Sequence, residues 1–152
     1  ILDLDVHQGD GTIDICKKYP SIYTCSIHSN SNFPYEKKQG WMDVGLPTGI
    51  KDNEYLETLH KTLKNIHSQI KPDIVLYDAG VDIFLDDKLG NLKISLDGIR
   101  KRDYIVLDHY RKLGIPIATV IGGGYDKNNQ KLAIRHSIIF KTAIEYIAVN
   151  TS

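Results

Sequence analysis

Short apolar runs alternate along the chain with longer segments in which apolar residues return every three or four positions. The runs predict strands at 1–6, 22–27, 73–80 and 116–121, with a brief extended segment at 42–47. The periodic segments predict helices at 12–19, 52–70, 95–113 and 129–149. Near-continuous apolar runs are typical of strands covered on both faces, and strands that alternate with helices indicate an α/β domain with a mainly parallel sheet.

Local signals place the ends of two helices and one long loop. Pro72 follows the apolar stripe of the helix at 52–70 and cannot continue it. Ser95 is a suitable N-cap for the next helix, and Gly114 suits the end of that helix because glycine adopts the left-handed conformation at no steric cost. Residues 28–41 form a polar loop, and a loop of this length inside a compact domain is often functional.

Composition changes this picture mainly by exclusion. The 152 residues are enough for one domain, and 19 Lys and Arg balance 19 Asp and Glu. We therefore expect no direct nucleic-acid partner. We also expect no membrane partner, because no apolar run approaches the span of about 20 residues that crosses a bilayer. Cys16 and Cys25 lack metal-type spacing, which indicates core thiols of an intracellular protein, cytoplasmic or, in a eukaryote, nuclear.

Asp3, Asp5 and His7 occupy alternate positions in the segment DLDVHQGDG, which otherwise looks like a buried strand. Alternate side chains of a strand point to the same side, and a rise of about 3.3 Å per residue puts Asp5 and His7 within reach of one ion. Burying an unpaired charge is costly. Carboxylate oxygens and neutral imidazole are zinc ligands, so a bound zinc ion would offset this cost. A metal ion is one explanation of the pattern, and a strand end that emerges into solvent is the other.

A third ligand is expected at the carboxyl end of another strand, because a catalytic zinc takes three protein ligands and keeps one position open. The segment LYDAGVDIFLDDKLG offers Asp78, Asp82, Asp86 and Asp87. Asp82 is the preferred candidate because it follows Gly80, where backbone can approach a site closely, and an ordinary acid of a loop is the alternative. Asp78 lies inside the strand, and Asp86 and Asp87 look like part of a solvated turn.

The segment IGGGYDKN at 121–128 follows a predicted strand. Its three glycines suggest a phosphate-binding loop, but the spacing is not G-x-G-x-x-G and no Lys-Ser/Thr pair follows. Tyr125 could instead donate its phenolic proton to an oxyanion, or be a tyrosine on a surface loop.

Together these segments resemble the zinc-dependent histone deacetylases, whose motifs occur here in the family's order as DLDVHQGDG, DAGVDIFLDDKLG, ISLDGIRKRD and GGGY. The resemblance covers nearly the whole chain. Gln8 and the run GIRKRD are most similar to the class IV branch. The resemblance implies a three-layer arginase/deacetylase-like α/β fold, with residues 1–152 as the C-terminal part of a single catalytic domain.

The resemblance also implies a reaction and the residues for it. Asp5, His7 and Asp82 correspond to the zinc ligands, and Tyr125 corresponds to the tyrosine that polarises the substrate carbonyl. The implied reaction is amide hydrolysis, in which metal-activated water removes acetyl or another acyl group from lysine side chains. The implied partner is an acyl-lysine protein or peptide.

Other residues correspond to supporting positions of the family. Asp3 corresponds to a residue beside the zinc ligands, in a neighbourhood that also holds a monovalent cation, K⁺ or Na⁺. Ser26 corresponds to a side chain of that cation site, with a buried serine bonded to backbone as the alternative. Phe33 of the long loop, together with Gly123 and Gly124, corresponds to the wall of the substrate tunnel, with a partly buried loop aromatic as the alternative for Phe33.

The chain departs from the family in its histidines. The family uses two adjacent histidines as general base and acid, upstream of the first motif, and this chain has no such pair. The chain also starts at Ile1 rather than Met. We therefore expect a piece of a longer protein that lacks the first strands of the sheet, exposes a sheet edge and an apolar face, and is inactive alone.

Three other functions use the same residues. A deacetylase of small molecules, such as acetylpolyamines, would share the fold and the ligands. An arginase-like site with two metals would need further acids, for which Asp3 and Asp78 are the candidates, and would leave GGGY without a role. The third is a deacetylase-like module without activity, although Tyr125 and all three ligand residues are present.

Overall fold

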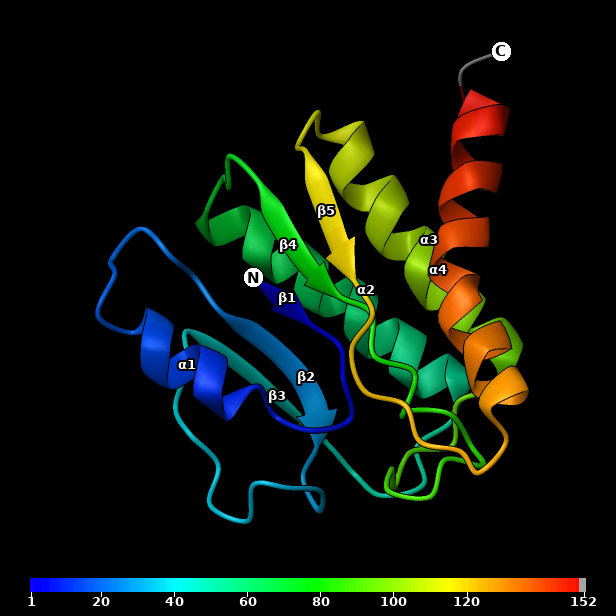
Figure 1. Ribbon diagram of the computed structural model, residues 1–152. Helices are drawn as coiled ribbons and strands as arrows, with labels where there is room; N and C mark the ends of the chain where they lie inside the picture. The colour runs from blue at the N-terminus through cyan, green and yellow to red at the C-terminus, as the bar shows by residue number, and fades with distance from the viewer. Residues whose placement is uncertain (151–152) are drawn as a thin grey trace.

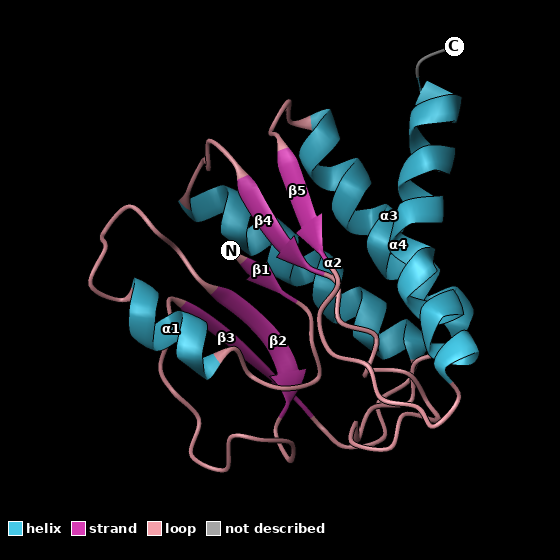
Figure 2. Cartoon of the chain, in the orientation of Figure 1, coloured by secondary structure: helices cyan, strands magenta, loops and turns pink. Residues whose placement is uncertain are grey.

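Strands and helices alternate along the chain in the computed structural model, which describes residues 1–150 (Figure 1). The strands are β1 (Leu2–Asp3), β2 (Cys25–Ser29), β3 (Met42–Leu46), β4 (Val75–Asp78) and β5 (Ile117–Val120). The helices are α1 (Asp10–Cys16), α2 (Asp52–Gln69), α3 (Leu96–Lys112) and α4 (Asn129–Asn150). The strands form a parallel sheet in the order β3-β2-β1-β4-β5, which confirms the predicted α/β class (Figure 2).

β1 lies at the centre of the sheet, between β2 and β4. Asp3 of β1 pairs with Ser26 on one side and with Asp78 on the other. The chain runs from β1 outward to β2 and β3, then returns to add β4 and β5 on the opposite side of β1. Ligands of such sheets bind beyond the carboxyl ends of the strands where the order reverses. The topology therefore places a site at the tips of β1 and β4.

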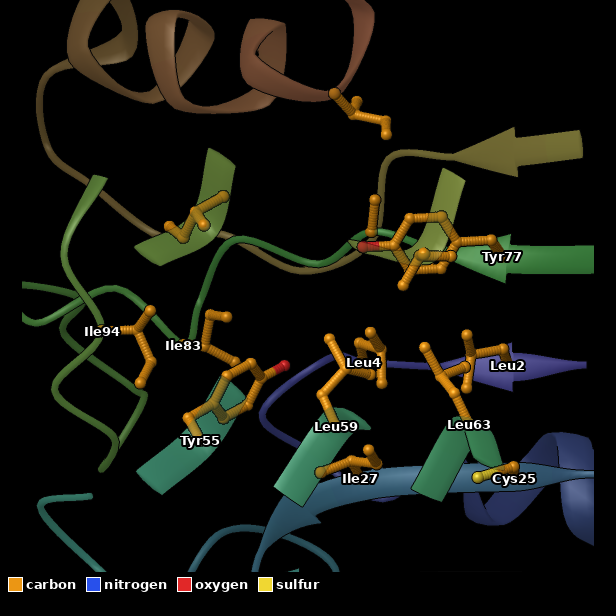
Figure 3. Close-up of a cluster of buried hydrophobic side chains, with 14 of the residues drawn as sticks. Leu2, Leu4, Cys25, Ile27, Tyr55, Leu59, Leu63, Tyr77, Ile83 and Ile94 are labelled. Atoms are coloured by element: carbon orange, nitrogen blue, oxygen red, sulfur yellow. The ribbon is translucent and has the colours of Figure 1, made fainter. Parts of the chain in front are cut away.

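Helices pack mainly on one face of the sheet. α2 and α3 cover this face and α4 packs on α3, whereas the short α1 lies on the other side, near β2 and β3 (Figure 1). Tyr55, Leu59 and Leu63 of α2 point toward the sheet and belong to one buried cluster with Leu4 and Ile27 (Figure 3). This core fixes the strands relative to one another, and with them the positions of their carboxyl ends.

The first strand is shorter than the predicted range 1–6 and ends at Asp3. Asp3 Oδ1 accepts the N–H of Asp5 at 3.0 Å, and Asp5 Oδ1 accepts the N–H of His7 at 2.9 Å. Acidic side chains that bond to nearby backbone compete with a sheet ladder. The prediction of regular strand geometry as far as His7 is therefore wrong.

Helix ends follow the local signals. Ser95 Oγ accepts the N–H of Gly98 at 3.0 Å, and Gly114 has a φ of +70°, so both predicted helix-end residues are confirmed. At the start of the chain, α1 (10–16) and β2 (25–29) are displaced from the predicted ranges 12–19 and 22–27.

One face of β4 and β5 carries exposed apolar side chains. Leu76 of β4 is 49% exposed and Val120 of β5 is 60% exposed. Phe140 and Ile144 of α4 are 53% and 67% exposed. Apolar side chains are therefore exposed on β4, β5 and α4, and of the three expected layers the third contains α1 alone among the described residues. Within residues 1–150, no helix combines the length and apolar character needed to cross a bilayer.

Candidate metal centre

Asp5, His7 and Asp82 meet at the carboxyl ends of β1 and β4. His7 Nδ1 lies 3.0 Å from Asp5 Oδ1 and 3.1 Å from Asp82 Oδ2. One ligand atom of each residue lies within 4.8 Å of the other two, and no other such group of three occurs in the part of the chain that the structure describes. The fold thus brings Asp82 to Asp5 and His7, from which it is separated by more than 70 residues in sequence.

Backbone groups hold the two carboxylates in place. The N–H of Val6 donates to Asp82 Oδ1 at 2.8 Å, and the N–H of Gly123 donates to Asp5 Oδ2 at 2.6 Å. Each carboxylate therefore uses one oxygen to hold a neighbouring segment and turns the other toward His7. This arrangement orients the acids before any ligand binds.

The three groups strongly affect one another's protonation. Hydrogen bonds to Asp5 and Asp82 raise the pKa of His7 to about 10. Burial raises the pKa of Asp82 to about 6. For Asp5, burial also acts upward, but the hydrogen bonds from His7 and Gly123 outweigh it and lower the pKa. Without a metal, a proton on His7 therefore balances part of the charge of the two acids.

The chemistry of these donors fits a divalent metal. Zinc binds carboxylate oxygen and neutral imidazole nitrogen, and three protein ligands leave a position for water. A divalent cation would replace the proton of His7 and would neutralise Asp5 and Asp82 together. The observed donor set therefore fits a catalytic divalent metal.

Tyr125 borders the three side chains. Its ring meets the ring of His7 edge-on, with centroids 6.3 Å apart, and the residue is 43% exposed. Partial burial raises the pKa of Tyr125, and the charges of Asp82 and Asp5 add to this effect. The phenol therefore keeps its proton at neutral pH and is able to donate it.

The glycines before Tyr125 bring backbone directly against the acids. A Cβ at Gly123 would overlap carboxylate oxygens of Asp5 and Asp82, and a Cβ at Gly122 would overlap Asp78. Glycine is required here because the approach is so close. Acidic neighbours repel anions, so the surroundings of this loop argue against the phosphate-binding alternative.

Phe33 and Gly124, which are also predicted to line the tunnel, have surroundings different from those of Gly123. Phe33 is 60% exposed, and its carbonyl oxygen accepts the N–H of Gln8 at 3.3 Å. Gly124 lies against Val81 and His136, where a side chain would have no room. The tunnel role of Phe33, Gly123 and Gly124 stays a prediction.

Asp3, Ser26 and Asp78 lie next to one another on the three central strands. Burial raises the pKa of Asp3 to about 8, and the charge of Asp78 adds to the effect. Ser26 Oγ lies 3.0 Å from Nδ1 of the buried His28, so the serine pairs with a side chain rather than with backbone. The neighbourhood is acidic, and its role as a monovalent cation site stays a prediction.

The sequence reasoning missed a buried arginine beneath the site. Arg102 of α3 donates to the carbonyl oxygens of Gly80 at 2.5 Å, Ala79 at 3.2 Å and Leu4 at 3.4 Å. Its charge is paired with Asp103 Oδ1 at 2.9 Å. Arg102 thereby connects the two strand ends that lead to the candidate metal centre. The signal in the sequence is the position of Arg102 three residues after Ile99 and four residues before Val106, on the apolar side of the helix.

The predicted solvated turn is only partly correct. Asp86 is exposed as expected, but Asp87 is only 7% exposed, and the prediction is wrong for this residue. The carboxylate of Asp87 is buried because backbone N–H groups surround it, one of them from Tyr125.

Comparisons with known proteins identify the family of the chain. The histone deacetylase domain family matches residues 1–139. An uncharacterized protein of Picosynechococcus is 46% identical over 143 residues, which is 94% of this chain and 48% of that protein. Histone deacetylase 2 of Arabidopsis thaliana is 33% identical over 135 residues, covering 87% of this chain and 35% of that protein. The chain thus spans less than half the length of these relatives.

Solved structures show the same fold. An HDAC homolog complexed with SAHA superposes with a TM-score of 0.77 at 26% identity, covering 93% of this chain and 41% of that chain. An acetylpolyamine aminohydrolase from Burkholderia pseudomallei superposes with a TM-score of 0.78 at 21% identity, covering 93% of this chain and 43% of that chain. Both support the predicted arginase/deacetylase-like architecture.

Proposed function

The chain belongs to the histone deacetylase domain family, and from this we propose that the whole protein is a zinc-dependent amide hydrolase. The proposed substrate is an acylated lysine side chain of a protein or peptide, from which acetyl or another acyl group is removed. The observation that carries the proposal is the convergence of Asp5, His7 and Asp82, with Tyr125 beside them. Residues 1–152 are proposed to be the C-terminal part of a single catalytic domain.

Asp5, His7 and Asp82 are the proposed zinc ligands. Nδ1 of His7 is the ring nitrogen that faces both carboxylates, and it must lose its proton to bind a metal. When bound, zinc supplies a Lewis acid and lowers the pKa of water to about 7. Val6 and Gly123 contribute by fixing the second oxygen of each carboxylate.

Tyr125 is the proposed oxyanion donor. Its hydroxyl would donate a hydrogen bond to the substrate carbonyl oxygen as negative charge develops there. A preorganised donor of this kind contributes on the order of 100- to 1000-fold in rate.

The general base is proposed to lie in a part of the whole protein outside this chain, in a pair of adjacent histidines. A base must reach the attacking water. His7 is assigned as a ligand, His28 is buried beside Ser26, and the remaining histidines lie in α2, α3 and α4. We therefore expect residues 1–152 to be inactive alone.

Two finer assignments accompany the proposal. Asp3 and Ser26 would bind K⁺ or Na⁺ beside Asp78, where a cation would offset the charge that accumulates between the strands. The class IV assignment rests on the run GIRKRD, which contains Arg102 and Asp103, and it stays a prediction.

Acetylated polyamines are the alternative substrate class. The chain shares its fold with an acetylpolyamine aminohydrolase, but a likeness of fold alone does not select a substrate. Both substrates would present an amide to the same metal centre, so the shape of the predicted substrate tunnel would have to distinguish them.

The test is an assay of the whole protein with an acetyl-lysine peptide and, separately, an acetylpolyamine. We expect turnover of the peptide that a chelator abolishes and zinc restores. Tyr125→Phe should reduce kcat by about 100- to 1000-fold with unchanged zinc content. Preference for the polyamine would move the assignment to small molecules, and no turnover of either substrate by zinc-loaded protein would contradict the hydrolase. Turnover by residues 1–152 alone would show that the base lies within them.

A further inference from the structure

Asp87 links a turn of the chain to the loop that carries Tyr125. Its Oδ1 accepts the N–H groups of Leu89 at 2.9 Å and Gly90 at 3.1 Å. Its Oδ2 accepts the N–H of Tyr125 at 2.8 Å. Both oxygens of this buried carboxylate are therefore used, and all three donors are backbone groups.

The bond to Tyr125 is the long-range member of this set. It joins residues 38 positions apart, whereas the other two bonds close the turn of Asp87 itself. On the other side, Arg135 Nη2 donates to the carbonyl oxygen of Tyr125 at 3.4 Å and pairs with Asp126 at 3.2 Å. Charged side chains thus hold both backbone groups of Tyr125.

The backbone of Tyr125 needs these hydrogen bonds because packing around its side chain gives little support. The ring is 43% exposed and meets His7 only at its edge. Packing therefore does not fix the hydroxyl as tightly as it fixes a core side chain. The neighbouring Asp86 is exposed, so only Asp87 of these two adjacent acids forms the bond to Tyr125.

We propose that Asp87 is a positioning residue for the reaction, which fixes the backbone of Tyr125 and through it the place of the phenol beside the metal centre. The proposal rests on the function proposed above for Tyr125. Asp87 itself touches neither substrate nor metal in this role. Because a misplacement of about 1 Å can cost on the order of 100-fold in rate, loss of the bond should slow the chemical step.

A double-mutant cycle in the whole protein tests this role. Asp87→Ala should lower kcat by about 10- to 100-fold with little change in KM or zinc content. The matched control Asp86→Ala, one residue away and exposed, should keep the activity of the wild type. In a Tyr125→Phe background, Asp87→Ala should cause no further loss, because no hydroxyl remains to be positioned. If the two losses multiply, Asp87 does not act through Tyr125 and the proposal is overturned.

Amide hydrogen exchange supplies a readout that does not depend on turnover. Asp87→Ala should accelerate exchange at the amide of Tyr125, and unchanged exchange would overturn the proposal. Should Asp87→Ala not fold, Asp87→Asn keeps the volume and replaces one acceptor oxygen by a donor, and it serves in the same cycle.

The two proposals fail in different ways. If Tyr125→Phe is as active as the wild type, the function proposed for Tyr125 is wrong and the positioning role is overturned with it. If Tyr125→Phe is impaired and only the double mutant departs from expectation, the positioning role alone is overturned.

Discussion

Two groups of buried charged side chains lie near the carboxyl ends of β1 and β4. The lower group contains Arg102, Asp103 and Tyr77, and the upper group contains Asp5, Asp82 and His7. Their charges are balanced in different ways. Below the ends, Arg102 and Asp103 are fully buried and paired at 2.9 Å, and the hydroxyl of Tyr77 donates to the same Asp103 oxygen at 2.6 Å. Above the ends, Asp5 and Asp82 face a single imidazole. The first group contains its own cation, whereas the second has two acids and an imidazole that, with an ordinary pKa of about 6.5, would be mostly neutral at pH 7.

This difference separates a structural network from a binding site. The lower group contains its own cation, so its charge is balanced within the protein and its hydrogen bonds support the strands, although within residues 1–150 Asp103 Oδ2 is buried without a hydrogen-bond partner. The upper group must take up a proton or a metal, because two adjacent carboxylates without a cation repel each other. The raised pKa of His7 is the sign of this demand. A buried group whose acids outnumber its cations is therefore a candidate site, and a group in which each acid is paired with a cation is not.

The largest expected effect on stability comes from breaking the lower group. Arg102→Met removes the cation that pairs with Asp103, and it also removes the side-chain donor to three carbonyl oxygens. Loss of one partner of a buried pair typically costs about 3–5 kcal/mol, so we expect the free energy of unfolding to fall by that amount. Chemical denaturation of the whole protein measures it.

A matched control lies on the same helix. Arg100 forms an exposed pair with Asp97 at 3.1 Å, and Arg100→Met should change the free energy of unfolding by less than about 1 kcal/mol. Equal losses from Arg100→Met and Arg102→Met would show that the lower group is not special.

The second effect concerns the upper group, where a bound metal ion should increase the free energy of unfolding. Zinc at about 100 times its dissociation constant should raise the free energy of unfolding by about 2.7 kcal/mol, because it binds only the folded protein. Asp82→Asn removes one ligand and should abolish most of this gain, whereas Asp86→Asn should keep it. Thermal unfolding with and without zinc gives the comparison, and an undiminished gain in Asp82→Asn would remove Asp82 from the ligand set.

The smallest effect is expected at the edge of the lower group. Tyr77→Phe removes one buried hydroxyl from Asp103 but leaves the pair with Arg102, so the free energy of unfolding should fall by about 1–2 kcal/mol. Tyr35, which is 92% exposed, supplies the control Tyr35→Phe with no expected change. A loss as large as that of Arg102→Met would mean that the hydroxyl, rather than the cation, holds this group together.

The sequence predicted the candidate site better than its support. Asp5, His7, Asp82 and Tyr125 stand in short segments at strand ends, where topology brings side chains together, so their convergence was predictable. The length of β1 was not, because the bonds from Asp3 and Asp5 to nearby N–H groups replace a ladder that an alternating pattern suggests.

Asp87 and Arg102 show what only the tertiary structure decided. By itself, DDK reads as a solvated turn, and the burial of Asp87 depends on an N–H group 38 residues away. Arg102 likewise meets carbonyl oxygens 22 and 98 residues away in sequence. The order of strands and helices follows from the local repeat of apolar and polar residues, so the sequence alone determined this order. The partner of a buried charge is set by distant segments that meet only when the sheet has formed, and no local pattern records it.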